Sequence, residues 1–85
     1  MIRAEWTVNT TSGPVVGHTE REDVDTAFTA LVAALRAALP SWGPEHATAF
    51  AGLHRGAVAA LATGDRFEHR SAGVVVRVTR DAPPR

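Results

Sequence analysis

The stretch Val24-Asp-Thr-Ala-Phe-Thr-Ala-Leu-Val-Ala-Ala-Leu-Arg-Ala-Ala-Leu-Pro40 decides the fold class. Its large apolar residues recur at intervals of four, three, four and four: Val24, Phe28, Leu31, Leu35 and Leu39. At 100° per residue these side chains fall within a narrow stripe on one face of a helix. The spacing therefore predicts an amphipathic helix that buries this stripe against another layer.

The flanking residues predict where this helix begins and ends. Thr19, followed three residues later by Glu22, fits a capping box, in which each side chain bonds a free backbone amide of the first turn. Pro40 cannot continue a helix because it has no amide hydrogen. We therefore expect the helix to span roughly residues 20–39.

A second helix is predicted immediately downstream. Residues 41–44 form a short connection, and Pro44 suits the first helical position, where no amide bond is lost. The apolar stripe that follows is His46, Phe50, Leu53, Ala57 and Leu61. Gly64 is a fitting C-terminal cap. Because the connection is short, we expect the two helices to pack as an antiparallel hairpin.

The segment before the helices predicts a β-hairpin. Residues 2–10 alternate between the two faces of a strand, with one face apolar: Ile2, Ala4, Trp6 and Val8. Residues 11–14 are a turn cluster, and residues 15–18 are a short second strand. Gly17 within that strand indicates a bulge or a close approach of another part of the chain.

Residues 66–80 are also β-prone. Residues 66–70 alternate, residues 71–73 are a turn or a bulge, and Val74, Val76 and Val78 share one face. This region is either a hairpin or one bent strand, so the element order is ββααββ or ββααβ. Residues 81–85 are expected to form a flexible tail.

These elements predict a single α+β domain over residues 1–80. Its architecture is a two-layer sandwich, with an antiparallel sheet of three or four strands covered on one face by the antiparallel helix pair. The patterns do not choose the strand order. A chain of 85 residues has a thin margin of stability, and small domains often gain stability by oligomerising.

Composition excludes several classes of protein. The chain has no cysteine, so a disulfide or thiolate-zinc scaffold is impossible. The formal net charge is zero, which disfavours general electrostatic capture of nucleic acid. We see no apolar run long enough for a membrane span and no secretory signal, so we expect a cytoplasmic protein without membrane contact. The basic residues are all Arg, as expected for coding in a GC-rich genome.

Small residues on the backs of both helices are the main candidate interface. The first helix carries Ala30, Ala33 and Ala37 away from its stripe, and the second carries Gly52, Gly56, Ala59 and Ala60. Each glycine inside a helix costs about 0.8–1 kcal/mol relative to alanine. Either the two helices cross closely at these glycines, or a second chain docks there.

Two other groups are candidates for binding. Trp42, in the interhelix connection, either closes the end of the core or anchors a partner, and the first reading is favoured. His46, His54 and His69 are candidate pocket or pH-sensitive residues. The spacing of the histidines does not predict a metal site, and we expect no metal and no cofactor.

Arg3, Arg66, Arg70 and Arg77 are weak candidates for phosphate binding on the open face of the sheet. Sheet faces that bind RNA also stack bases on aromatic residues, whereas Trp6 and Phe67 fall on the core side here. For a helix-turn-helix reading, the second helix offers Glu45, Thr48 and Arg55 and has no Asn or Gln to contact bases. No catalytic motif is present.

The sequence thus favours a non-enzymatic interaction or regulatory module that binds another protein, most simply itself as a homodimer, through its Ala/Gly-rich helical layer. One alternative is a small-molecule binder or small enzyme with a pocket between sheet and helices, near the three histidines. A third is Arg-mediated binding of nucleic acid on the open sheet face, which is disfavoured.

Overall fold

The computed structural model describes residues 1–71 and 73–80, so the predicted tail at residues 81–85 lies outside the described residues. The chain folds as an α+β domain with the order ββααββ. The elements are β1 (Ile2–Thr10), β2 (Gly13–Arg21), α1 (Val24–Ala38), α2 (Pro44–Thr63), β3 (Arg66–Ser71) and β4 (Val74–Arg80). The α+β class and the two-layer arrangement predicted from the sequence are confirmed.

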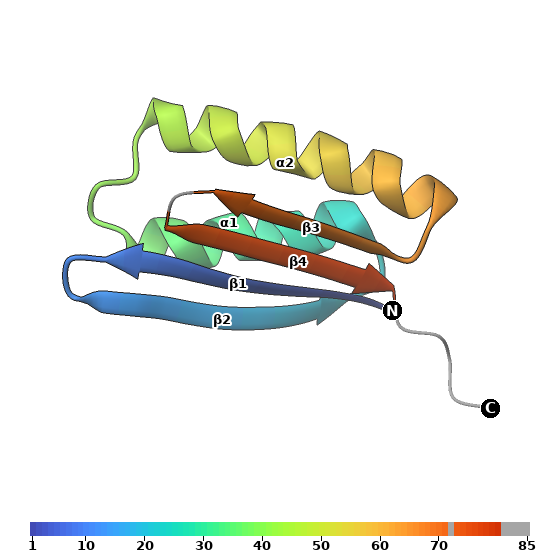
Figure 1. Cartoon of the computed structure of the whole chain (residues 1–85), viewed down its shortest axis with the longest axis horizontal. Helices are drawn as coiled ribbons and strands as arrows, with labels where there is room; N and C mark the ends of the chain where they lie inside the picture. Colours follow the sequence, from blue (N-terminus) through green and yellow to red (C-terminus); the bar gives the residue numbers. More distant parts are fainter. Residues whose placement is uncertain (72, 81–85) are drawn as a thin grey trace.

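The four strands form one antiparallel sheet in the order β2-β1-β4-β3 (Figure 1). The first and last strands of the chain therefore lie side by side in the centre, and each is flanked by its own hairpin partner. Residues 66–80 form a hairpin, which resolves the alternative of one bent strand. The strands β2 and β3 are the two edges of the sheet.

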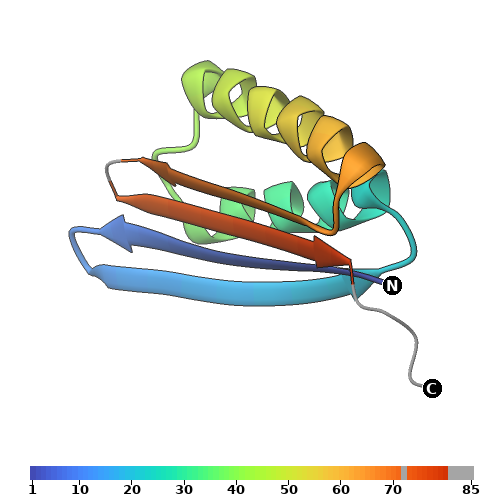
Figure 2. The same cartoon turned by 45° about the vertical axis from the view of Figure 1, so that its right-hand side comes forward.

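Both helices cover the same face of this sheet and run antiparallel (Figures 1 and 2). The first helix, α1, packs on β1 and β2, whereas α2 packs mainly on β3. The helices thus divide the sheet between them, and each also contacts the other. Among the described residues, no helix is long and apolar enough to cross a membrane.

The core lies between the two layers and contains the predicted stripes. Phe28, Leu31, Leu35 and Leu39 of the first helical stripe are buried, and Val24 packs against them. The inward residues of the central strands are also buried: Ile2, Ala4, Trp6, Val8, Val76 and Val78. The alternation read from the sequence therefore places the correct face of each central strand against the helices.

The predicted capping box at Thr19 and Glu22 is wrong. Residues 19–21 belong to β2, which is much longer than the predicted strand at residues 15–18, and Thr19 pairs with Ala4. The longer β2 pairs with the first residues of β1, from Ile2 opposite Arg21 to Ala4 opposite Thr19. Without residues 19–21, this end of β1 would have no partner on that side. The helix accordingly begins at Val24 rather than near residue 20.

The N-terminal cap of α1 is Asp23. Its carboxylate oxygen Oδ1 accepts hydrogen bonds from the Thr26 amide at 2.7 Å and from the Thr26 hydroxyl at 2.8 Å. These bonds lower the pKa of Asp23 below its ordinary value of 3.8. A negative charge here also interacts favourably with the positive end of the helix dipole.

Acid is expected to weaken the fold through Asp23. Because its folded pKa is lowered, the carboxylate stabilises the fold above the unfolded pKa, and this contribution is lost as the pH falls from about 4 through the folded pKa. Asp23→Asn keeps an acceptor at the cap but does not titrate. The stability advantage of the wild type over Asp23→Asn should therefore shrink below about pH 4 in urea titrations, and an advantage that does not change with pH would contradict this.

The start of α2 is held by a side chain of its own first turn, and its end is held by a side chain of β4. At its start, the Gly43 amide donates to Nδ1 of His46 at 3.0 Å, and Pro44 occupies the first turn as predicted. At its end, the Arg80 guanidinium of β4 donates to the Leu61 carbonyl at 2.8 Å. Gly64 is the C-terminal cap, as predicted. The Arg80 contact ties the last described strand to the last turn of the helix.

Candidate functional site

The outer edge of β2 presents backbone groups that have no partner strand in the described part of the chain. The Asn9 amide donates to the Gly73 carbonyl at 2.7 Å, so the odd-numbered residues of β1 bond to β4. The even-numbered residues of β1 then bond to β2, whose odd-numbered residues are their partners. The amides and carbonyls of the even residues of β2, such as Val16 and His18, therefore point away from the sheet.

This edge is long and regular. Its pairing with β1 runs without a bulge from Gly13 to Arg21. Val16 lies at its middle with 70% of its surface exposed. Pro14, which has no amide hydrogen, stands at an outward-pointing position, where no bond to β1 is lost.

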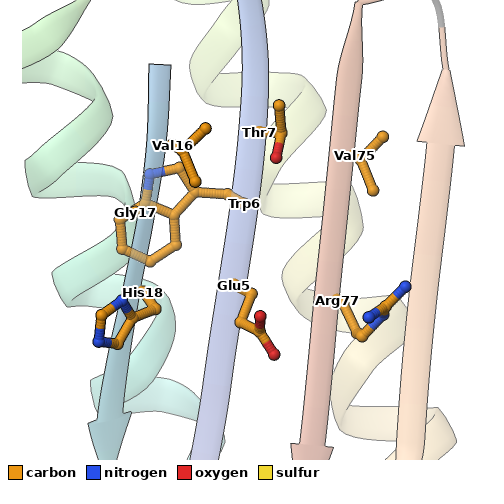
Figure 3. Close-up of a pocket in the computed structure, with 8 residues that line it drawn as sticks. All are labelled: Glu5, Trp6, Thr7, Val16, Gly17, His18, Val75 and Arg77. Atoms are coloured by element: carbon orange, nitrogen blue, oxygen red, sulfur yellow. The ribbon is translucent and has the colours of Figure 1, made fainter. Parts of the chain in front are cut away.

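Gly17 allows Trp6 to lie across β2 (Figure 3). A Cβ atom at position 17 would lie 2.5 Å from Cζ2 of the Trp6 indole, which is closer than real contacts allow. The close approach expected at Gly17 is therefore present, and the group that approaches is the Trp6 ring and not another backbone segment. The alternative, a bulge in β2, is not observed. As a result the buried indole of a central strand extends toward the sheet edge.

A groove runs between this edge and α1. It has a volume of about 400 Å³ and is lined by Trp6, three alanines of α1, residues 15–19 of β2 and, at the end of that strand, Arg21. The alanines are Ala30, Ala34 and Ala38, spaced one turn apart. Together with the exposed Ala37, which follows on the same side, they form what we call the alanine flank of α1. No charged side chain lies on this flank between residues 30 and 38.

The opposite flank of α1 faces α2 and is different in character. A second groove there, of about 320 Å³, is lined by Phe28, Thr29, Val32, Ala33, Arg36, Phe50 and His54. Nε2 of His54 lies 2.6 Å from Oδ1 of Asp25, and its ring stacks on Phe28 with a centroid distance of 4.9 Å. Ala33, predicted with Ala30 and Ala37 as one surface, therefore lies in a separate groove.

The small residues of α2 also lie in different surroundings. Gly56 faces β3, where a Cβ would lie 3.1 Å from the Phe67 ring, so this glycine serves packing within the chain. The close approach is between helix and strand, whereas the alternatives from the sequence were two crossing helices or the docking of a second chain. Gly52 has no such neighbour, and only the Arg55 guanidinium comes within 4 Å of its Cβ position. Ala59 is exposed and lines a hollow beside His54, and Ala60 is half-buried.

Trp42 lies at the end of the core. It is half-buried and packs against the core cluster. Its ring lies 5.6 Å from that of Phe50 and 5.4 Å from that of His46, measured between centroids. These contacts are those of a residue that closes the interior, which is the favoured reading from the sequence.

The candidate histidines occupy three separate places. His46 caps α2 through Gly43, and His54 lies in the groove between the helices. His69 is half-buried on the helix-covered face of β3, in register with Val76. Within residues 1–71 and 73–80, no three His, Asp or Glu side chains are grouped as metal ligands.

The arginines of the open sheet face are largely paired with carboxylates. Arg3 lies 3.4 Å from Glu5 and 3.3 Å from Glu20. Arg77 contacts Glu68 at 2.8 Å, and Arg70 contacts the same carboxylate at 3.4 Å. The hydrogen bond from Arg77 is the main cause of the lowered pKa of Glu68. Arg66 stands beside Thr79 on this face.

A shallow depression of about 180 Å³ lies between these ion pairs and β2. Figure 3 shows Glu5, Thr7 and Val75 along its length, with Arg77 and His18 on either side. Glu5 stands directly between His18 and Arg77 in the register, so a carboxylate separates the imidazole from the guanidinium across the sheet. This mixture of charges gives a polyanion no continuous basic surface.

The chain matches no protein-family model, no curated protein and no solved structure. The function is therefore inferred from the geometry of this chain.

Two parts of the candidate surface were missed in the sequence. Ala34 and Ala38 lie one and two turns after Ala30 and share its flank. A helical wheel drawn from the sequence contains this signal. It does not say which flank faces a sheet edge, because that depends on the strand order. The free edge at Val16 was missed for the same reason.

Proposed function

We propose that this chain is a small non-enzymatic interaction module that self-associates through the alanine flank of α1. The observation that carries the proposal is the groove where Ala30, Ala34 and Ala38 face the free edge of β2. This assignment keeps Ala30 and Ala37 from the sequence prediction. It leaves out Ala33, Gly52, Gly56, Ala59 and Ala60, which lie elsewhere.

Two physical arguments support self-association at this place. Solvent-facing helix surfaces usually carry charged residues, whereas this flank offers only methyl groups that a second helix can approach closely. The domain is also small, and burying this surface would add to a limited core. A stable interface of this kind buries about 1,200 Å² or more in total.

The alternatives have less support. A pocket built from three histidines needs them to converge, and His46, His54 and His69 lie apart. A phosphate site on the open face needs free guanidinium groups, and Arg3, Arg70 and Arg77 are paired with carboxylates.

Replacing Ala34 with Glu tests the proposal. The wild type is expected to have twice the chain mass in light scattering coupled to size exclusion. Ala34→Glu would place an unpaired carboxylate in the interface, and this should raise the dimer dissociation constant at least tenfold, a cost of about 1.4 kcal/mol or more. The matched control is Ala33→Glu, the next residue on the same helix, which is exposed on the opposite flank and should leave the mass unchanged.

The same series can reject the proposal. A wild type that stays at the mass of one chain over the whole concentration range excludes self-association. A dimer that survives Ala34→Glu and dissociates with Ala33→Glu moves the interface to the groove between the helices. Circular dichroism of each variant shows whether its fold is intact.

A further inference from the structure

We infer that the free edges of β2 from two copies pair antiparallel, so that two four-stranded sheets join into one continuous sheet of eight strands. The inference rests on the proposed self-association and specifies its geometry. In this arrangement Gly17 of each copy lies at the twofold axis, and the two α1 helices lie side by side above the joined strands.

The contrast between the two sheet edges is the first argument. The outward-pointing residues of β3 are Arg66, Glu68 and Arg70, and this strand has six residues. Charged side chains and a short length protect such an edge from pairing. The edge of β2 has nine residues, and its middle carries the exposed Val16 with an uncharged Gly17 beside it. Only this second edge lacks protection along its centre.

Other protective devices are also missing from the middle of β2. The strand has no bulge, and its residues that face the helices between Gly13 and Arg21 are uncharged: Val15, Gly17 and Thr19. Natural proteins twist an edge away with bulges or place inward charges on it when it must stay single. Pro14, which hinders pairing because it has no amide hydrogen, lies near one end of the strand, so the long regular centre is still suited to accept another strand.

The helix layer favours a second copy of this chain as the strand that pairs here. Because α1 packs on both β1 and β2, we place its axis over the boundary between these two strands, about half a strand spacing inside β2. At ~4.8 Å per strand, pairing β2 with a second β2 places the two α1 axes about 10 Å apart. Packed helices lie 8–10 Å apart, and the shorter distances require small side chains. The alanine flank supplies them on both helices.

The register follows from overlap along the strand. Antiparallel pairing centred on Gly17 gives each residue from 13 to 21 a register partner, whereas any shift leaves residues at the ends unpaired. Because Pro14 has no amide hydrogen, the outward amides that donate across this centre are those of Val16 and His18. In this register Val16 faces His18 of the second copy, and Glu20 faces Pro14 of the second copy. A shift of two residues toward the C-terminus would place the two His18 side chains opposite each other. The centred register keeps these two imidazole rings apart.

Single-cysteine variants can read this register, because the chain has no cysteine of its own. The variants are Val16→Cys, His18→Cys and Glu20→Cys, all on the open face. Each is oxidised with a mild thiol oxidant alone and in pairwise mixtures, and the cross-linked peptides are identified by mass spectrometry. Arg70→Cys on the β3 edge is the matched control for random collisions.

The mixture of Val16→Cys with His18→Cys is expected to cross-link at least about tenfold faster than any variant alone or the Arg70→Cys control, because disulfides require Cα atoms within about 7 Å. A dimer by mass that gives no such cross-link overturns the strand pairing and leaves the alanine-flank interface standing. A cross-link of His18→Cys with itself, or of His18→Cys with Glu20→Cys, overturns the proposed register. A monomer at all concentrations overturns both proposals.

Discussion

Replacing Phe28 with Ala is expected to lower the free energy of unfolding by about 3–5 kcal/mol, the usual range for removing a buried aromatic ring. Phe28 is 1% exposed and belongs to the core stripe of α1. Its ring also supports His54, which stacks on it nearly in parallel. Domains of this size have limited total stability, so this variant should unfold at a clearly lower temperature and urea concentration than the wild type.

Thermal and urea unfolding followed by circular dichroism measure this loss. The control Phe28→Leu keeps most of the buried apolar volume and should cost clearly less. A loss below about 1 kcal/mol for Phe28→Ala would contradict the core position assigned to the ring, since buried Phe truncations cost several times more.

Replacing Gly17 with Ala is expected to cost about 1–3 kcal/mol, although it adds a single methyl group. That methyl would lie 2.5 Å from Cζ2, 2.6 Å from Cε2 and 2.8 Å from Nε1 of the Trp6 indole. The ring is buried where it crosses β2, so it cannot turn away without disturbing its neighbours. The added methyl group would therefore strain the packing of β2 against Trp6.

The matched control is Gly52→Ala, in the middle of α2. Its added Cβ meets only the flexible end of Arg55 at 3.8 Å, and alanine is the better helix former by about 0.8–1 kcal/mol. Gly52→Ala should therefore raise the unfolding free energy, whereas Gly17→Ala lowers it. A Gly17→Ala variant as stable as the wild type or more stable would show that Trp6 does not pack against Gly17 as described.

The helices and the core were predictable because their signals are local and repeated. Five apolar residues at helical spacing place α1, and strict alternation places the buried face of β1. The capping residue was missed because two acceptable caps, Thr19 and Asp23, lie four residues apart. The choice between them depends on how far β2 extends, which is set by pairing with β1 and not by the helix.

The candidate surface was only partly predictable for a similar reason. The sequence shows that α1 has alanines away from its stripe, but Ala30 and Ala33 are equivalent until the neighbours of the helix are known. In the folded chain, the edge strand β2 lies on one side of α1 and the helix α2 lies on the other side. Ala30 therefore lines the groove beside β2, whereas Ala33 lines the groove beside α2.

The central position of β1 and β4 has a consequence for how the chain acquires its structure. Residues near the two ends of the sequence are direct neighbours, from Ile2 beside Arg80 to Val8 beside Val74. During synthesis on the ribosome, the β1–β2 hairpin and both helices emerge before β4 is made. Until then β1 has only one neighbouring strand, β2. Contacts of such high sequence separation slow folding. Until they form, the nascent chain exposes strand edges that attract other unfinished chains, and the last strand to be synthesised completes the sheet.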